Sequence, residues 1–295
     1  MSALQTQQTR AGYGQDNLVH VWRIPYVAHT GVAREAYVVL PRWYGPADDP
    51  AIPLIISPHG RGISARANAR RWGNLPALGS FAVVCPDGQG RRFKLFAWGD
   101  PGDISDLARM PNIVREALPF VHIEPRRIYA FGSSMGGQET LLLLAQYPHL
   151  LAGAAAFDAD TNLATRYRMV RFLRYGSLLQ SMLRDEVGGT PATNPVGYML
   201  RSPIAYAHRI ADSGVPLQIW WSRTDRIVRN QQQQSGLLYR RIRHWNRAAP
   251  VVQMVGAWDH SDDFRAVTQL PFALRTFLLL PPRRTIPSSS SGLSA

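Results

Sequence analysis

This 295-residue chain has one cysteine, one lysine and no long apolar run. Cys85 is the only cysteine, so no intrachain disulfide can form, and its place in an apolar run predicts a buried, unreactive thiol. A membrane-spanning helix needs about 20 consecutive apolar residues, and no apolar run in this chain is that long. Residues Met1–His20 are polar and contain no apolar core typical of a signal peptide. These absences predict a cytoplasmic protein with no membrane partner.

Arginine carries nearly all of the positive charge, since Lys94 is the only lysine. With 33 basic and 20 acidic residues, the formal net charge is +13, a balance that would suit a nucleic-acid ligand. However, most arginines are scattered, and no zinc-finger or RNA-recognition motif accompanies them. We therefore expect no nucleic-acid partner. Three arginine clusters stand out: Arg166/Arg168/Arg171/Arg174, Arg240/Arg241/Arg243/Arg247 and Arg283/Arg284.

Short apolar runs alternate with helical patterns along most of the chain, which is typical of a parallel sheet with helices on both faces. Before them, Leu18–Tyr26 and Arg34–Leu40 alternate in polarity and predict an antiparallel hairpin at a sheet edge. Six further strands are expected at Pro53–Ser57, Phe81–Cys85, Ile128–Phe131, Ala152–Phe157, Leu217–Trp221 and Val251–Val255. Helices are expected at Arg66–Leu78, Ile104–Phe120, Met135–Gln146, Gln231–Asn246 and Asp263–Leu279. The predicted class is α/β, with a mostly parallel, eight-stranded sheet.

A single large domain is expected over residues 18–280, because the strand and helix patterns run through that whole range. Residues 1–17 are rich in Gln, Thr and Gly and predict a flexible arm, and the Pro- and Ser-rich residues 281–295 predict a disordered tail. The partly helical, arginine-rich residues 163–212 interrupt the rhythm of strands. We interpret them as a small helical cap inserted into the domain.

A Gly-x-Ser-x-Gly motif joins the strand that ends near Phe131 to the following helix, and Ser134 lies at its centre. A serine hydroxyl becomes a useful nucleophile only when it is held out from the backbone, beside a base and hydrogen-bond donors. A sharp turn with glycine at 132 and 136 holds it in this way, because larger residues there would collide with the strand and the helix. The motif predicts Ser134 as a nucleophile, against the alternative of a plain glycine and serine turn.

The stretch Ser57-Pro58-His59-Gly60-Arg61-Gly62 follows another predicted strand and is expected to line the same site. A tetrahedral oxyanion needs two backbone donors. One would be the N–H of Met135, and the other would come from Gly60 or Arg61. His59 is expected to support the loop rather than act as a base.

Two further polar residues follow predicted strands at the same edge of the sheet, which is where such sheets carry their chemistry. Asp225 is the candidate acid that would orient a histidine, although it could also be a helix cap. Asp158 and Asp160, after the preceding strand, are rival acids. His260, in the loop after the last strand, is the candidate base, because imidazole exchanges protons near neutral pH. The chain order Ser, Asp, His is the one that a nucleophile-elbow site uses.

These motifs together resemble the α/β-hydrolase superfamily over about residues 30 to 280. The elbow Phe131-Gly132-Ser133-Ser134-Met135-Gly136-Gly137 is similar to that of esterases, polyhydroxyalkanoate depolymerases, feruloyl esterases and prolyl-oligopeptidase-like hydrolases. Glu124-Pro125-Arg126-Arg127-Ile128 and Ser202-Pro203-Ile204-Ala205-Tyr206 also resemble segments of that group. The resemblance implies an α/β-hydrolase fold with Ser134, Asp225 and His260 as its triad. Ser222-Arg223-Thr224 departs from it, because the family often has glycine in the approach to the acid.

We therefore expect a serine hydrolase without metal or cofactor that cleaves small carboxylic esters through an acyl-enzyme. The same triad would serve a peptidase or amidase of prolyl-oligopeptidase type or another acyl or C–C bond hydrolase, and a catalytically silent binding protein would share the fold. Aromatic residues are the candidates for the substrate pocket, although plain packing would also explain them. They are Trp98, Tyr167, Phe172 and Tyr175.

Overall fold

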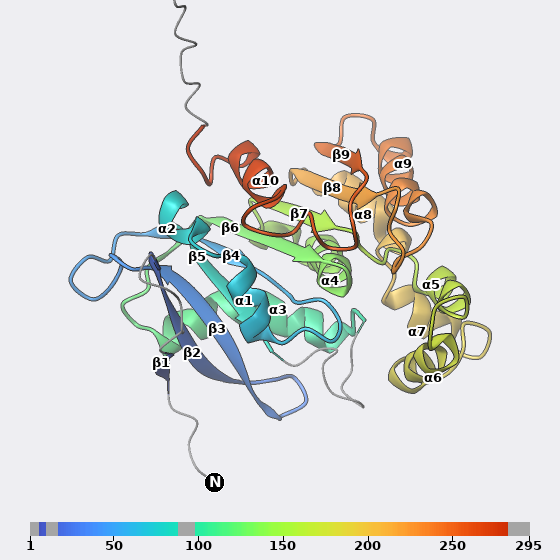
Figure 1. The fold of residues 1–295 in the computed structure, drawn as a ribbon, viewed down its shortest axis with the longest axis horizontal. Coiled ribbons are helices and arrows are strands. Elements are labelled where there is room, and N and C mark those ends of the chain that lie inside the picture. The colour runs from blue at the N-terminus through green and yellow to red at the C-terminus, as the bar shows by residue number, and fades with distance from the viewer. Residues whose placement is uncertain (1–5, 10–16, 88–97, 283–295) are drawn as a thin grey trace, which may run out of the picture.

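A computed structural model describes residues 6–9, 17–87 and 98–282, and a single sheet runs through it (Figure 1). The described strands follow the order β1-β2-β3-β5-β4-β6-β7-β8-β9. They are β1 (Gln7–Thr9), β2 (Val19–Val27), β3 (Ala33–Pro41), β4 (Ile52–Ile56), β5 (Ala82–Pro86), β6 (Ile123–Ser133), β7 (Gly153–Phe157), β8 (Leu217–Ser222) and β9 (Val251–Gly256). The expected α/β class and mostly parallel sheet are confirmed, with β1 as a strand that was not expected.

Parallel pairing holds from β5 through β4, β6, β7 and β8 to β9. The hairpin of β2 and β3 is antiparallel, and β3 also pairs antiparallel with β5. The short strand β1 then adds to the outer side of β2, with Gln8 opposite Trp22. Part of the segment expected as a flexible arm is thus a strand, because the free edge of β2 offers unpaired backbone groups to any extended neighbour.

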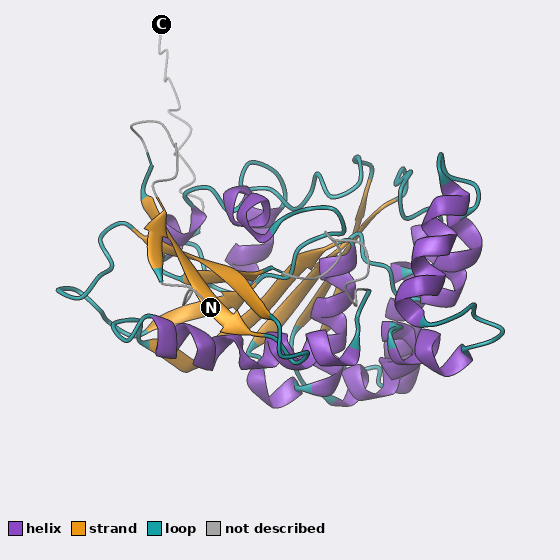
Figure 2. Ribbon diagram, turned by 90° about the horizontal axis from the view of Figure 1, so that it is seen from below, coloured by secondary structure: helices purple, strands orange, loops and turns teal. Residues whose placement is uncertain are grey.

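The helices lie on both faces of the sheet, as expected (Figure 2). They are α1 (Ala65–Arg71), α2 (Leu75–Gly79), α3 (Pro101–Ala117), α4 (Met135–Gln146), α5 (Leu163–Val170), α6 (Gly176–Val187), α7 (Pro195–Leu200), α8 (Ala207–Asp212), α9 (Ser235–Trp245) and α10 (Leu270–Thr276), with 3₁₀ turns at Pro148–Leu150, Pro203–Tyr206 and Gln231–Gln233. Strand side chains alternate between two cores: Leu54 and Ile56 face α3 and α4, whereas Ile55 faces α1 and α10.

Two expected helices differ from those observed. The predicted helix Arg66–Leu78 is divided into α1 and α2, because the chain turns at Gly73, where φ is +49°. Of the predicted helix Asp263–Leu279, only the last part is helical. Pro271 lies in the first turn of α10, a position that suits a residue without a backbone N–H. No described helix is long and apolar enough to span a bilayer.

Helices α5, α6 and α7 lie beside the carboxyl ends of the strands and form the cap (Figure 1). Leu163, Leu183 and Tyr198 pack there in a small core of their own, which also includes Trp98 and Met135 at the elbow. The last part of the expected insertion behaves differently. Helix α8 joins the main helical layer, because Ile210 and its neighbours pack into the large core with α4 and α9.

Candidate active site

Ser134 lies in a strained turn between β6 and α4, with φ of 59° and ψ of −124°. Its N–H donates to Phe157 O at 2.8 Å, and its carbonyl accepts from Gln138 N at 3.0 Å. The flanking glycines are sterically required. A Cβ at Gly132 would lie 2.3 Å from Gly136 O, and a Cβ at Gly136 would lie 2.2 Å from Pro58 O. The sharp bend therefore exists because strand, helix and oxyanion loop approach at backbone contact.

Asp225 and His260 are brought together from the loops that follow β8 and β9. Asp225 Oδ2 lies 2.8 Å from His260 Nδ1, and its Oδ1 accepts from Ile227 N at 2.8 Å and Val228 N at 2.9 Å. Burial raises the pKa of Asp225, but its hydrogen bond with His260 and the His260 charge, with help from Gln231 and Ile227 N, hold the pKa below its ordinary value. Asp225 is therefore an ionised carboxylate that holds the Nδ1 edge of the imidazole.

Asp158, the first rival acid, occupies a different position beside the same histidine. Its carboxylate accepts from Ser222 N and Ser261 N, both at 2.9 Å, and from Trp258 Nε1 at 3.1 Å. Burial and the neighbouring Asp225 raise its pKa to about 6. Asp158 thus links the end of β8 to the loop that carries His260, and these three hydrogen bonds go to the two segments rather than to the His260 ring.

Asp160, the second rival, is buried in an ion pair with Arg166, whose Nε lies 3.2 Å from Asp160 Oδ1. Burial raises the pKa of Asp160, opposed by the charges of Arg166 and His260. Arg166 also donates to Ile227 O. This ion pair ties α5 of the cap to the loop after β8, so Asp160 is engaged away from the imidazole nitrogen.

The loop of residues 57–62, where an oxyanion donor is expected, lies against Ser134. A Cβ at Gly60 would be 3.6 Å from Ser133 O and from the Cβ of Ser134. Met135 begins α4, so its N–H has no acceptor within that helix. His59 Nδ1 lies 2.9 Å from Gly60 O, consistent with the expected supporting role. The Arg61 side chain turns to the cap instead: it pairs with Glu186 at 2.7 Å and lies over the Trp98 ring, 4.2 Å from its centroid.

The chain is similar to known hydrolases in part of its sequence and in its fold. No family model matches the chain. Over 110 residues, 35% of this chain, it is 34% identical to poly(3-hydroxyalkanoate) depolymerase C of Paucimonas lemoignei, and that match takes up 27% of the depolymerase. The S-formylglutathione hydrolase of Agrobacterium tumefaciens superposes on 94% of this chain and 99% of its own length, with a TM-score of 0.64 and 14% identity. The chain has the α/β-hydrolase fold.

Two further structures with this fold are an esterase and a peptidase. An esterase of Pyrobaculum calidifontis superposes on 88% of this chain and 83% of its own, with a TM-score of 0.63 and 15% identity. Dipeptidyl peptidase 4 of Porphyromonas gingivalis superposes on 88% of this chain, with a TM-score of 0.65 and 18% identity, but this chain spans only 35% of that peptidase. Esterases and peptidases thus share this α/β-hydrolase architecture.

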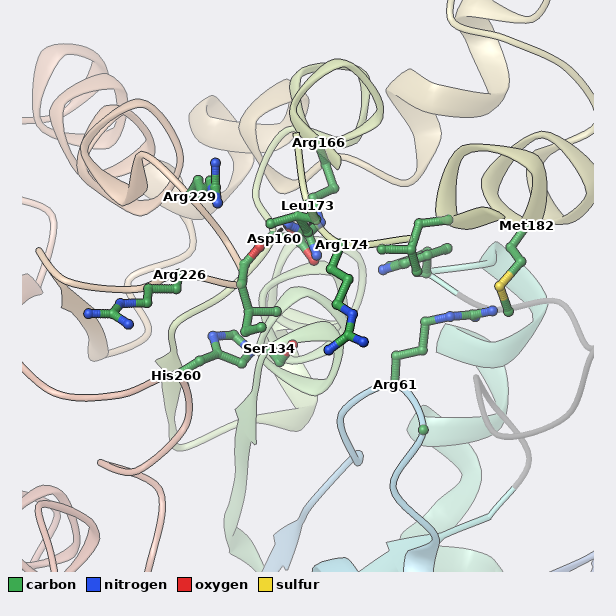
Figure 3. A pocket seen from close by; sticks show the side chains of 14 residues that line it. Arg61, Ser134, Asp160, Arg166, Leu173, Arg174, Met182, Arg226, Arg229 and His260 are labelled. Carbon is green, nitrogen blue, oxygen red and sulfur yellow. Dashed lines mark hydrogen bonds and ion pairs between the residues drawn. The ribbon is translucent and has the colours of Figure 1, made fainter. Parts of the chain in front are cut away.

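A cavity of about 580 Å³ opens between the elbow, the loops after β8 and β9, and the cap (Figure 3). Ser134 and His260 both line it, as do Trp98 and Arg61. Tyr167 and Phe172, expected in the pocket, do not. Tyr167 packs edge-on against Tyr198 within the cap, with ring centroids 5.8 Å apart, and Phe172 is 54% exposed.

Tyr175 also lies outside the cavity lining, and it is 66% exposed at the surface of the cap. The residues that sequence reasoning missed are arginines. Arg174, Arg226 and Arg229 line the cavity, together with the paired Arg61 and Arg166. The first arginine cluster of the sequence was the available signal, but only the folded cap shows that Arg174 faces the elbow.

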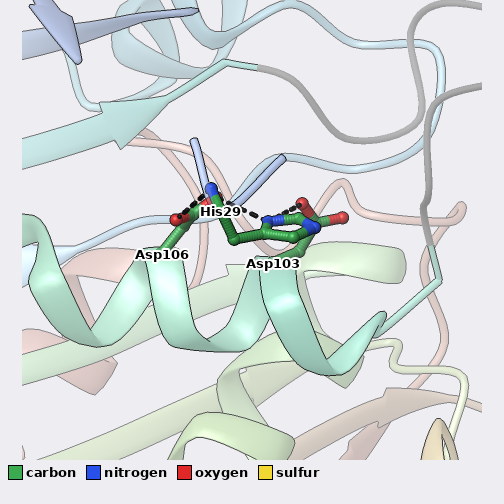
Figure 4. A group of neighbouring side chains, drawn as sticks. All are labelled: His29, Asp103 and Asp106. Carbon is green, nitrogen blue, oxygen red and sulfur yellow. Dashed lines mark hydrogen bonds and ion pairs between the residues drawn. The ribbon is translucent and has the colours of Figure 1, made fainter. Parts of the chain in front are cut away.

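A second cluster of titratable groups lies on α3, where Asp103 and Asp106 meet His29 from the turn between β2 and β3 (Figure 4). His29 Nδ1 lies 2.9 Å from Asp106 Oδ2. Arg34 pairs with Asp103 at 3.1 Å and Arg109 with Asp106 at 2.9 Å. The spacing would allow a metal ion, but two arginines already balance these carboxylates. The cluster fastens the hairpin to α3.

The group of Asp158, Asp225 and His260 is also close enough to hold a metal ion. However, Asp158 accepts three N–H donors, and Asp225 accepts two backbone donors. This donor set favours carboxylates that hold an imidazole over carboxylates that bind a cation. The arrangement suits proton transfer at His260.

Proposed function

We propose that this α/β-hydrolase is a serine hydrolase that cleaves carboxylic esters through an acyl-enzyme. The observation that carries the proposal is the meeting of three distant segments: Ser134 on the elbow and His260 line one cavity, and the far side of the His260 ring is held by Asp225. Nucleophile, base and orienting acid each come from a different strand end, as this fold requires.

In this mechanism Asp225 accepts a hydrogen bond from the Nδ1–H of His260, which leaves Nε2 unprotonated and able to take the proton of Ser134. Ser134 Oγ attacks the ester carbonyl, and His260 then gives the proton to the departing alcohol. His260 next takes a proton from water, which attacks the acyl-enzyme; the bond between the acyl group and Ser134 Oγ breaks, Oγ regains a proton from His260, and the acid is released. The backbone N–H of Met135 and that of Gly60 or Arg61 would hold the oxyanion, and losing one such donor typically costs about 3 kcal/mol.

The preference for esters over amides is supported by two of the similar proteins. One is named a depolymerase of a poly(3-hydroxyalkanoate), and one is named an esterase. The peptidase reading has support from the dipeptidyl peptidase likeness, which covers only 35% of that protein. Comparing p-nitrophenyl butyrate with the matching p-nitroanilide separates the two, since a peptidase would turn over the anilide at a comparable rate.

Ser134→Ala tests the proposal with p-nitrophenyl butyrate as substrate. We expect a fall in kcat of about 10⁴-fold or more, because no other group can take over the attack. Ser133→Ala is the matched control: Ser133 is the buried neighbour whose hydroxyl donates to Ser261 at 2.5 Å, so its loss should leave turnover within about tenfold. Turnover by Ser134→Ala at the wild-type rate would refute the assignment.

A further inference from the structure

The cavity over Ser134 is strongly cationic. Among the described residues that line it, five are arginines, Arg61, Arg166, Arg174, Arg226 and Arg229, and one, Asp160, is acidic. Two of the five charges are balanced, since Arg61 pairs with Glu186 at 2.7 Å and Arg166 pairs with Asp160 at 3.2 Å.

The other three arginines have no such balance. In the described ranges, no carboxylate lies within ion-pair distance of Arg174, Arg226 or Arg229. Among the residues whose structure is not described, 88–97 contain no Asp or Glu, and Asp16 is the one acidic side chain. Three arginines without a carboxylate partner in the described ranges therefore line a cavity that a substrate must enter.

Of the three, Arg174 is the best placed to contact a molecule bound over Ser134. Its side chain comes from the loop between α5 and α6 and reaches down into the cavity toward Ser134 and His260 (Figure 3). Arg226 and Arg229 lie on the other side, in the segment that follows Asp225, with their guanidinium groups turned outward (Figure 3). Of the three, Arg174 is thus the one whose side chain points toward Ser134 and His260 in this view.

Apart from these charged residues and from Ser134, His260 and Gly62, the described side chains that line the cavity are apolar. Leu173, Leu179 and Met182 come from the cap, and Ile227 and Trp98 complete the wall. A volume of about 580 Å³ is in the usual range for small-molecule sites. The site therefore combines room for a short hydrocarbon chain with a guanidinium beyond it, which is complementary to an amphiphilic molecule with one anionic end.

We propose that the substrate is an ester that also carries a carboxylate, and that Arg174 binds this carboxylate while Ser134 attacks the ester carbonyl. The inference rests on the proposed hydrolase function and names its substrate class. A guanidinium binds a carboxylate through two parallel N–H···O bonds, and neither group loses its charge near neutral pH. Arg226 and Arg229 would raise the rate of encounter with an anion, an effect that salt screens.

Two substrates of equal length test the proposal: p-nitrophenyl hydrogen adipate and p-nitrophenyl hexanoate differ only in the terminal carboxylate. We expect the wild type to favour the adipate ester by about 10- to 100-fold in kcat/KM, the range of one hydrogen bond to a charged group. Arg174→Gln should reduce that ratio at least tenfold, mainly by raising KM for the adipate ester, and Arg174→Lys should restore part of it. The ratio should also fall in 0.5 M salt.

Arg171→Gln is the matched control. Arg171 belongs to the same arginine cluster, lies over the Phe172 ring at 4.6 Å and does not line the cavity, so this variant should keep the wild-type ratio. Equal rates for the two esters in the wild type, or equal losses on both in Arg174→Gln, would overturn the proposal.

If neither ester is turned over, the proposed hydrolase function fails, and binding decides the inference by itself. Adipate should then raise the unfolding temperature of the wild type but not that of Arg174→Gln. The absence of a shift in the wild type, or the same shift in both proteins, would contradict carboxylate recognition by Arg174.

Discussion

Asp225→Asn gives the most informative test of how the imidazole is held. Asp225 Oδ1 accepts from Ile227 N at 2.8 Å and Val228 N at 2.9 Å, whereas Oδ2 faces His260 Nδ1 at 2.8 Å and Gln231 Nε2 at 3.2 Å. In the variant, the amide oxygen keeps the two backbone bonds, so the NH₂ group turns to the histidine. An NH₂ group can only donate to Nδ1, which moves the ring proton to Nε2, and His260 can then no longer accept the proton of Ser134.

The expected cost is large because the wrong tautomer removes the base altogether. We predict a fall of about 10⁴-fold in kcat for p-nitrophenyl butyrate, or about 5 kcal/mol of transition-state stabilisation, with little change in KM. The unfolding temperature should fall only modestly, because the backbone bonds at Oδ1 survive. Steady-state kinetics and thermal unfolding on the same preparation check both expectations.

Asp158→Asn is the matched control, since Asp158 is a second buried carboxylate beside His260 that accepts from Ser222 N, Ser261 N and Trp258 Nε1. We expect this variant to lose stability but to keep more than about a tenth of the wild-type kcat. If Asp158→Asn loses activity and Asp225→Asn keeps it, the acid has been assigned to the wrong strand end.

Two further predictions concern the scaffold. Gly136→Ala should abolish folding or displace the elbow, because the new Cβ would lie 2.2 Å from Pro58 O. Gly31→Ala is the control: its Cβ would enter open space at φ of +77°, so it should lower the free energy of unfolding by only about 1 kcal/mol. Urea denaturation measures both effects. Since the pKa of Asp158 rises from 3.8 to about 6 on folding, the folded state binds the proton more tightly, and this group's contribution to stability should fall by about 2 kcal/mol as the pH rises from about 4 to 6. That contribution should be absent in Asp158→Asn, so the difference between the two unfolding free energies should shrink over this range; a difference that does not change with pH would contradict it.

The parallel sheet and the elbow could be predicted because local sequence determines them. Apolar runs such as Ile52–Ile56 must be buried on both faces, and only glycine fits at 132 and 136. The positions of Asp225 and His260 after successive strands followed from the order of the runs. Strand β1 could not be predicted, because a polar segment without alternation pairs only when a partner edge is present.

The pocket was much less predictable than the elbow. An aromatic residue in a cap helix packs inward or faces water according to the neighbouring helices, and this tertiary context placed Tyr167 against Tyr198 and left Phe172 exposed. Arg171 and Arg174 each lie over the ring of the next residue, at 4.6 and 5.1 Å, but only Arg174 also lines the cavity. Likewise, the sequence favours Asp225 as the acid but leaves Asp158 as a rival, and it is the 2.8 Å contact between Asp225 Oδ2 and His260 Nδ1 that distinguishes Asp225 in the structure.

Labelling with a fluorophosphonate probe, followed by mass spectrometry of the modified peptide, tests the central claim most directly. Such a probe reacts with a serine that a neighbouring base activates. We predict one adduct, on Ser134, that disappears in Ser134→Ala, is strongly slowed in Asp225→Asn and remains in Ser133→Ala. An unlabelled wild-type protein, or an adduct on any other serine, would contradict the proposal that Asp225 and His260 activate Ser134.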